Sequence, residues 1–171
     1  IQTMHEIIRE VEEREEKYYR FAEEAEHLTH AGAIGASASL SALKVDAEVI
    51  VCLTSTGTTA NIISGYRPKA RIVAVTDELD VLNRLELVWG LQTLPIRPYS
   101  NLDQIIDQVE KVLIQYGLAK SGDKVVMTLG MPIYEGSKTN TLHIFTIAGD
   151  QYSRRPDEDV PLRCRKETPN F

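Results

Sequence analysis

The chain reads Val49-Ile50-Val51-Cys52-Leu53-Thr54-Ser55-Thr56-Gly57-Thr58-Thr59 at the point that decides its fold. An apolar run of this length, bounded by turn signals, is typical of a strand that is buried on both faces. A helix is predicted next, over residues 59–66, and it ends before Pro68 because the residue preceding a proline disfavours the helical conformation. A buried strand that turns directly into a helix begins a βαβ unit, so the chain is predicted to be an α/β protein.

The same alternation of strand and helix continues along the chain. Strands that are separated by helices of ordinary length predict parallel βαβ units. The last two strands are joined only by residues 130–140, which is too short for a helical crossover, so the fifth strand is expected to be antiparallel to its neighbour or at an edge. The predicted fold is a three-layer α/β/α domain with a five-stranded, mostly parallel sheet. Strands are predicted at residues 48–53, 71–75, 91–96, 124–129 and 141–147, and helices at residues 30–43, 59–66, 79–88 and 102–116.

The two ends of the chain differ from this middle part. Residues 1–28 have a helical apolar pattern and carry nine Glu against four Lys or Arg. Residues 148–171 form a polar tail that is expected to be irregular. We therefore predict three parts: a helix over 1–28, an α/β domain over 29–147 and the tail over 148–171. Because the chain begins inside a helical pattern and without Met, it is expected to be a piece or a processed product of a longer protein.

Composition excludes several classes of protein. The formal net charge is -6 and no basic stripe is present, so no nucleic-acid partner is expected. No apolar run is long enough to span a bilayer, so no membrane association is expected. Only Cys52 and Cys164 are present, which predicts neither a disulfide framework nor a zinc site and favours a reducing, cytoplasmic location. No metal-ligand spacing and no nucleophile–base arrangement stands out, so neither catalytic residues nor a metal site are predicted.

The six residues after the first strand carry five hydroxyl groups and one glycine. A loop at this place exposes backbone N–H groups and the positive end of a helix dipole, which together attract a phosphate group. Simple capping of the helix by one hydroxyl is the alternative interpretation. A nucleotide P-loop is excluded because no Gly-Lys-Ser/Thr closes the sequence. The residues predicted to bind phosphate are Thr54, Ser55, Thr56, Gly57, Thr58 and Thr59.

A second loop, residues 130–140, leaves the fourth strand at the same edge of the sheet. In parallel sheets, ligands bind at the carboxyl ends of the strands. Lys138 supplies a cation there, and Gly136 or Ser137 supplies donors for a second phosphate. An ordinary connecting loop with a surface lysine is the alternative interpretation.

Several stretches, together with their spacing, resemble the C-terminal domain of pyruvate kinases over about residues 1–147. The resemblance implies a five-stranded α/β domain whose fifth strand is antiparallel, and it implies that residues 1–27 are the last helix of the family's catalytic barrel. It also implies a dimer or tetramer that uses this domain at a subunit interface. The stretches that carry the resemblance are Ile50-Val51-Cys52-Leu53-Thr54-Ser55-Thr56-Gly57-Thr58-Thr59-Ala60, Gly65-Tyr66-Arg67-Pro68-Lys69-Ala70, Ile72-Val73-Ala74-Val75-Thr76, Leu87-Val88-Trp89-Gly90-Leu91, Gly117-Leu118-Ala119-Lys120-Ser121-Gly122-Asp123 and Gly136-Ser137-Lys138-Thr139-Asn140-Thr141.

The resemblance also implies a binding site. Residues 54–59 would hold a phosphate of an allosteric sugar phosphate, and the loop containing Gly136 and Ser137 would close over that ligand. The helix at 102–116 lacks the Trp or Arg that some members use for a second phosphate, so the effector is expected to be AMP or a sugar monophosphate. The parent reaction, from phosphoenolpyruvate and ADP to pyruvate and ATP, uses magnesium and often potassium in the barrel. No cofactor and no activity are therefore expected of this chain alone. A structural oligomerisation domain with a degenerate effector site is the alternative, and an independent small enzyme is disfavoured because no nucleophile–base pair is present.

Overall fold

The structure is a computed structural model that describes residues 3–4, 6–7, 10, 29–133 and 137–148. The predicted helix over 1–28 and the predicted tail over 148–171 lie almost wholly outside the described residues. The helices of the described domain are α2 (His30–Val45), α3 (Thr58–Tyr66), α4 (Leu79–Leu85) and α5 (Leu102–Gln115), and the strands are β1 (Val49–Leu53), β2 (Arg71–Thr76), β3 (Leu91–Pro95), β4 (Lys124–Leu129) and β5 (Thr141–Thr146).

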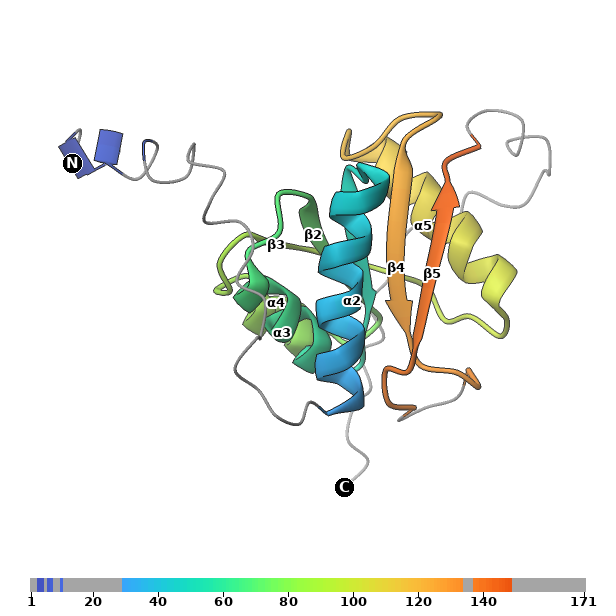
Figure 1. Cartoon of the computed structure of the whole chain (residues 1–171). Helices are drawn as coiled ribbons and strands as arrows, with labels where there is room; N and C mark the ends of the chain where they lie inside the picture. Colours follow the sequence, from blue (N-terminus) through green and yellow to red (C-terminus); the bar gives the residue numbers. More distant parts are fainter. Residues whose placement is uncertain (1–2, 5, 8–9, 11–28, 134–136, 149–171) are drawn as a thin grey trace, which may run out of the picture.

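Five strands form one sheet in the order β3-β2-β1-β4-β5 (Figure 1). The strands β3, β2, β1 and β4 run parallel, and β5 pairs antiparallel with β4 at the edge, with Met127 opposite His143. The predicted α/β class, the five-stranded sheet and the antiparallel fifth strand are thus confirmed. The short connection between β4 and β5 explains the antiparallel pairing, because only a helical crossover could have made it parallel.

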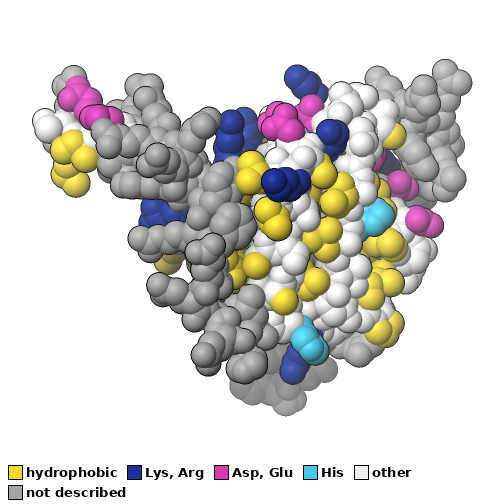
Figure 2. All heavy atoms as spheres, in the orientation of Figure 1, with side chains coloured by type: hydrophobic (Ala, Val, Ile, Leu, Met, Phe, Trp, Pro, Cys, Tyr) yellow, Lys and Arg dark blue, Asp and Glu magenta, His cyan; other side chains and the backbone are white. Residues whose placement is uncertain are grey.

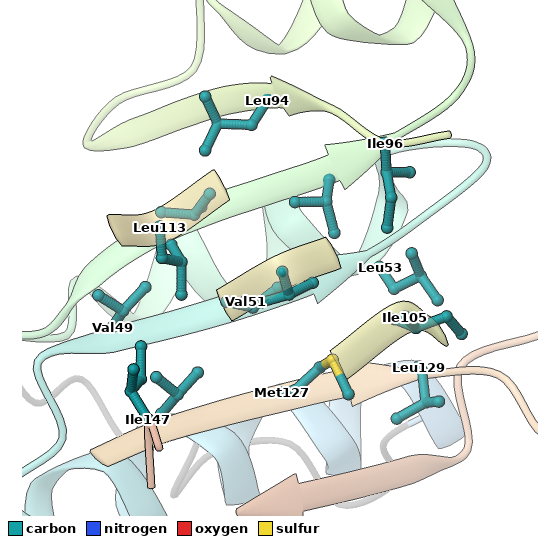
Figure 3. Close-up of a cluster of buried hydrophobic side chains, with 14 residues drawn as sticks. Val49, Val51, Leu53, Leu94, Ile96, Ile105, Leu113, Met127, Leu129 and Ile147 are labelled. Carbon is teal, nitrogen blue, oxygen red and sulfur yellow. The ribbon is translucent and has the colours of Figure 1, made fainter. Parts of the chain in front are cut away.

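Helices cover both faces of the sheet and bury two separate apolar clusters. Side chains of β1 alternate between the faces, so that Val49, Val51 and Leu53 meet α5 while Ile50 and Cys52 meet the α2, α3 and α4 layer. Figure 3 shows the α5 side of the sheet, where Ile105 and Leu113 from the helix approach Val51 and Met127. Every residue of β1 is buried, as expected of a central parallel strand that is covered twice.

The small residues of α2 allow close packing against α3. A Cβ atom added at Gly35 would lie 2.8 Å from Cγ2 of Ile62, which is closer than real carbon atoms approach. The buried face of the helix is also made of small side chains, among them Ala38 and Ala42. The helix begins cleanly because Oγ1 of Thr29 accepts a hydrogen bond from the Gly32 N–H at 3.1 Å.

The helix and strand boundaries predicted from sequence for the described domain agree with the structure to within two residues, except in α4. The prediction that this helix reaches residue 88 is wrong, because it ends at Leu85. The chain then tightens into a turn in which the Val88 N–H donates to the Leu85 carbonyl at 2.9 Å. The turn is held by α3 and the residue that follows it: the Ser64 hydroxyl donates to the Trp89 carbonyl at 2.6 Å, and the Arg67 guanidinium lies 4.7 Å from the centre of the Trp89 ring. These tertiary contacts override the local helical pattern.

The helix α5 has a strongly amphipathic pattern and one buried carboxylate that the sequence does not reveal. The Asn101 side chain caps its start by accepting from the Gln104 N–H at 2.9 Å. Glu110 is buried beside the end of β5 and accepts a hydrogen bond from the Ala148 backbone. Burial raises the pKa of Glu110 above its usual range, the Ala148 hydrogen bond opposes this, and the charge of Asp107 adds to it.

Candidate functional site

The two loops singled out by the sequence leave neighbouring strands at the same edge of the sheet. In the sheet β1 pairs with both β2 and β4, so the order of strands reverses at β1 and β4. In open parallel sheets this reversal creates a crevice at the carboxyl ends of the strands. A cavity of about 940 Å³ lies there. It is lined by Thr29, His30, Ala31, Leu53, Thr54, Ser55, Thr56, Thr58, Thr59, Asp77, Glu78, Pro98, Tyr99, Gly130, Ile133, Ser137, Lys138 and Thr139.

The loop between β1 and α3, residues 54–57, is shaped by one buried threonine. Oγ1 of Thr54 accepts a hydrogen bond from the Gly57 N–H at 2.8 Å. Gly57 has φ +81, a left-handed conformation that glycine adopts without strain. The hydroxyls of Thr56 and Thr58 hydrogen-bond to each other at 3.1 Å on the exposed side, and Ser55 is exposed beside them. The loop therefore presents Ser55, Thr56 and Thr58 outward and uses Thr54 to hold its own turn.

The first turn of α3 has no side-chain cap of the ordinary kind. Its N-cap residue is Gly57, which has no side chain that could accept a hydrogen bond from the first turn. The closest side-chain acceptor is Oγ1 of Thr56, which lies 3.5 Å from the Thr58 nitrogen, at the limit of a hydrogen bond. The first N–H groups of a helix have no intrahelical acceptor, so those of α3 that follow Thr58 can donate to an anion in the cavity. Both interpretations of the hydroxyl-rich sequence therefore have a counterpart in this geometry: Thr54 and Thr56 accept hydrogen bonds at the helix start, and further hydroxyl groups are exposed beside it.

Thr59 connects the first loop to the second. Its side chain is buried, and its hydroxyl lies 2.6 Å from the hydroxyl of Thr139, which precedes β5. The start of α3 is thereby joined to a segment 80 residues away in the sequence. Thr59 was predicted to bind ligand, whereas the structure gives its hydroxyl a partner inside the protein.

The second loop folds back against its own beginning. A Cβ atom added at Gly130 would contact Oγ of Ser137 and would lie 2.9 Å from the Ser137 carbonyl oxygen. Glycine is therefore required where the chain leaves β4. Ser137 and Lys138 both line the cavity, and Lys138 is exposed at its mouth. Gly136, the other residue predicted for this loop, lies outside the described residues.

The charges around the cavity are unevenly distributed. Among the described residues that line it, Lys138 is the only Lys or Arg. Arg84 from α4 contacts the loop of residues 54–57, where its Nη2 donates a hydrogen bond to the Thr56 carbonyl. Asp77 and Glu78, which follow β2, bring two carboxylates to the other side of the cavity.

Sequence reasoning missed these two acidic residues, and it also missed Tyr99 and the start of α2. Tyr99 lies between β3 and α5, half-buried, and its pKa is raised first by burial and then by the charge of Asp77. The phenol hydroxyl is a group that can donate a hydrogen bond. Thr29 and His30 place the N-terminus of α2 at the cavity beside that of α3. The position of Asp77 directly after the second strand was the one signal in the sequence that could have identified it.

Two further features of the described part of the chain concern membranes and metal ions. None of its helices has the length and hydrophobicity needed to cross a bilayer. No group of three or more His, Cys, Asp or Glu side chains in this part is arranged to hold a metal ion. His143 of β5 stacks on Phe145 with 5.7 Å between ring centres.

Comparison with known proteins gives a consistent result. The family described as the pyruvate kinase α/β domain matches residues 32–145. Among curated proteins, the pyruvate kinase of Geobacillus stearothermophilus is 35% identical over 150 residues, covering 86% of this chain and 26% of that protein. The pyruvate kinase of Lactobacillus delbrueckii subsp. bulgaricus is 31% identical over 158 residues, covering 90% of this chain and 27% of that protein.

A solved structure shows the same likeness. A crystal structure of a pyruvate kinase from Cryptosporidium parvum superposes with a TM-score of 0.65 at 28% identity, covering 72% of this chain and 24% of that one. The chain thus spans about a quarter of the length of the relatives it matches.

Proposed function

The chain belongs to the pyruvate kinase family as its C-terminal α/β domain, and from this we propose that it binds a phosphorylated small-molecule effector and contributes to a subunit interface. The observation that carries the first part is the N-terminus of α3, which has a glycine as its N-cap residue and opens into a cavity beside three outward hydroxyl side chains. Phosphate is the group that this arrangement suits best, because it accepts several hydrogen bonds at once and carries the charge that a helix N-terminus favours.

In this proposal each part of the cavity has a distinct task. The backbone N–H groups of the first turn of α3 and the hydroxyls of Ser55, Thr56 and Thr58 donate to the phosphate oxygens. Lys138 adds a positive charge from the opposite loop. Arg84 holds the Thr56 carbonyl and so keeps the loop in the shape that points its N–H groups toward the ligand.

The same geometry offers a route for regulation. The hydrogen bond between Thr59 and Thr139 joins the start of α3 to the residues just before β5, the edge strand of the sheet. A ligand that moves or fixes the start of α3 therefore acts on β5 through one contact. Such an effect requires that the ligand bind one arrangement more tightly than another.

We propose that the chain by itself does not carry out the parent reaction between phosphoenolpyruvate and ADP. The magnesium and potassium that the family uses would belong to the barrel. Such catalysis in the full protein would be regulated, and not performed, by this domain.

Calorimetric titration of the chain with ribose 5-phosphate, AMP and fructose 1,6-bisphosphate tests effector binding, with ribose as the unphosphorylated control. We expect at least one phosphate ester to bind and ribose not to bind. Ser55→Glu should weaken binding by about tenfold or more, because a carboxylate beside a phosphate is repelled. Ser121→Glu is the matched control, since Ser121 is also exposed but lies away from the cavity. Failure of every phosphate ester to bind at millimolar concentration would contradict the proposal.

The proposed subunit interface lies on the face formed by α2 and β5. Figure 2 shows hydrophobic side chains gathered over these two elements, and the larger ones include Leu40, Leu43 and Ile144. In the described sheet β5 has a partner on one side only, so its outer edge offers unpaired backbone groups to a second copy. This face also suits the alternative role of the chain, a structural oligomerisation domain without an effector.

Light scattering is expected to show that the chain is a dimer or a larger oligomer and that Ile144→Lys shifts it to the monomer. Ile144 is 42% exposed, so a lysine costs little within one subunit but places a charge in the interface. Ile114→Lys is the matched control, because Ile114 is 44% exposed on α5. An oligomer that survives Ile144→Lys would exclude this face, whereas a stable oligomer without any ligand response would favour the purely structural role.

A further inference from the structure

Asp77 lies beside the loop of residues 54–57 because of the register of the sheet. Leu53 of β1 pairs with Val75 of β2, and the Thr54 N–H donates to the Val75 carbonyl at 3.1 Å. The residues that follow the two strands therefore leave the sheet next to each other. Asp77 and Glu78 both line the cavity, on the side of β2.

The surroundings of Asp77 suit the hydroxyl-bearing part of a ligand. Tyr99 lies close enough for the charge of Asp77 to add to the effect of burial on its pKa. Pro98 and Ile133 line the same cavity and contribute apolar surface. The cavity thus has a donor-rich part at the start of α3 and, beside β2, a part with two carboxylates and one phenol.

This asymmetry distinguishes between possible ligands. A second phosphate near β2 would face two carboxylates, and the described lining offers no Lys or Arg besides Lys138 to compensate. A sugar hydroxyl in the same place would donate to a carboxylate instead. In dinucleotide-binding α/β folds an acidic residue about 20 residues after the glycine-rich turn accepts hydrogen bonds from ribose hydroxyls. Asp77 follows the second strand in the same way, 20 residues after Gly57.

We propose that Asp77 determines the specificity of the effector site: its carboxylate accepts hydrogen bonds from the hydroxyls of a sugar monophosphate and repels a ligand that carries a second phosphate. The inference rests on the proposed function, since it assumes that one phosphate binds at the start of α3. It goes further by assigning the hydroxyl-binding residue and the class of ligand that it excludes.

A pairwise titration tests the inference with the chain as it exists. Ribose 5-phosphate and 2-deoxyribose 5-phosphate differ by one hydroxyl, and Asp77→Asn removes the charge of the acceptor. We expect the original chain to bind ribose 5-phosphate about tenfold or more tightly than the deoxy compound, as is typical of a hydrogen bond to a charged group. In Asp77→Asn this ratio should shrink towards one, while the affinity for fructose 1,6-bisphosphate should rise.

The matched control is Asp80→Asn, which makes the same change in net charge at an exposed position of α4 that does not line the cavity. It should leave both affinities and their ratio unchanged. A ratio near one in the original chain, or a large ratio that persists in Asp77→Asn, would overturn the assignment of Asp77 even though a phosphate ligand binds. If no phosphate ester binds at all, the proposed function fails first, so the two failures are distinguishable. Circular dichroism checks that Asp77→Asn is folded, which its exposed position predicts.

Discussion

Replacing Leu113 by alanine is expected to lower the free energy of unfolding by about 2–5 kcal/mol, the usual cost of removing a large buried side chain. Leu113 is 1% exposed and packs in the cluster between α5 and the sheet (Figure 3). In the described domain α5 covers this face of the sheet by itself, so no neighbouring helix can move into the space that the removed Leu113 side chain leaves. Chemical denaturation with urea, followed by circular dichroism, measures the loss.

The adjacent residue provides the control for Leu113. Ile114 belongs to the same helix but is 44% exposed, and alanine is the better helix former at such a position. Ile114→Ala should therefore change the free energy of unfolding by less than about 0.5 kcal/mol. Equal losses in the two variants would mean that α5 does not pack on the sheet as described.

Most of the fold follows from sequence periodicity because four strands of its sheet run parallel and the central ones are buried. The continuous apolar run of β1 and the amphipathic pattern of α5 are local signals, and both elements form where they are predicted. The end of α4, in contrast, is not determined by residues that are neighbours in the sequence. Ser64 of α3 and Arg67 directly after that helix hold the turn around Trp89, and no window of neighbouring residues contains these contacts.

The candidate site likewise has one part that could be predicted from the sequence and another that could not. Residues 54–59 could be singled out because five hydroxyl groups exceed what a helix cap needs, and the position after a strand is readable from sequence. The pairing of Thr59 with Thr139 and the approach of Asp77 could not be predicted so directly. They depend on which strands are neighbours and in which register, and the strand order 3-2-1-4-5 is set by the packing of the whole sheet. Sequence therefore predicts the hydroxyl-rich loop of the cavity better than its acidic side.

Gly57→Ala is expected to have the largest effect on the site, because it combines backbone strain with a clash. At φ +81 an alanine is strained, and its Cβ atom would lie 2.8 Å from Cδ2 of Leu85. Leu85 is fully buried and cannot rotate away without disturbing the core around it. Strain in the left-handed region and overpacking together should lower the free energy of unfolding by about 2–4 kcal/mol.

Two other glycines separate these causes. Gly122 has φ +90 but nothing within 4 Å of an added Cβ, so Gly122→Ala should show the strain alone, about 1–2 kcal/mol. Gly65 has open space and no positive φ, so Gly65→Ala should be neutral or stabilising within α3. A loss in Gly57→Ala no greater than in Gly122→Ala would show that Leu85 yields to the added methyl group.

The ligand affinity of Gly57→Ala then links the strain to the proposed function. Gly57 is the N-cap residue of α3, and its N–H is held by Thr54, so a shift of this residue tilts the N–H groups that are proposed to bind phosphate. At a temperature where the variant is still folded, its affinity for the sugar phosphate that binds the original chain should fall by about tenfold or more, as is typical when a preorganised group of donors is misplaced. Gly122→Ala should bind normally although it too is destabilised, because Gly122 lies outside the cavity. Equal affinities in all three glycine variants and the original chain would place the phosphate somewhere other than the start of α3.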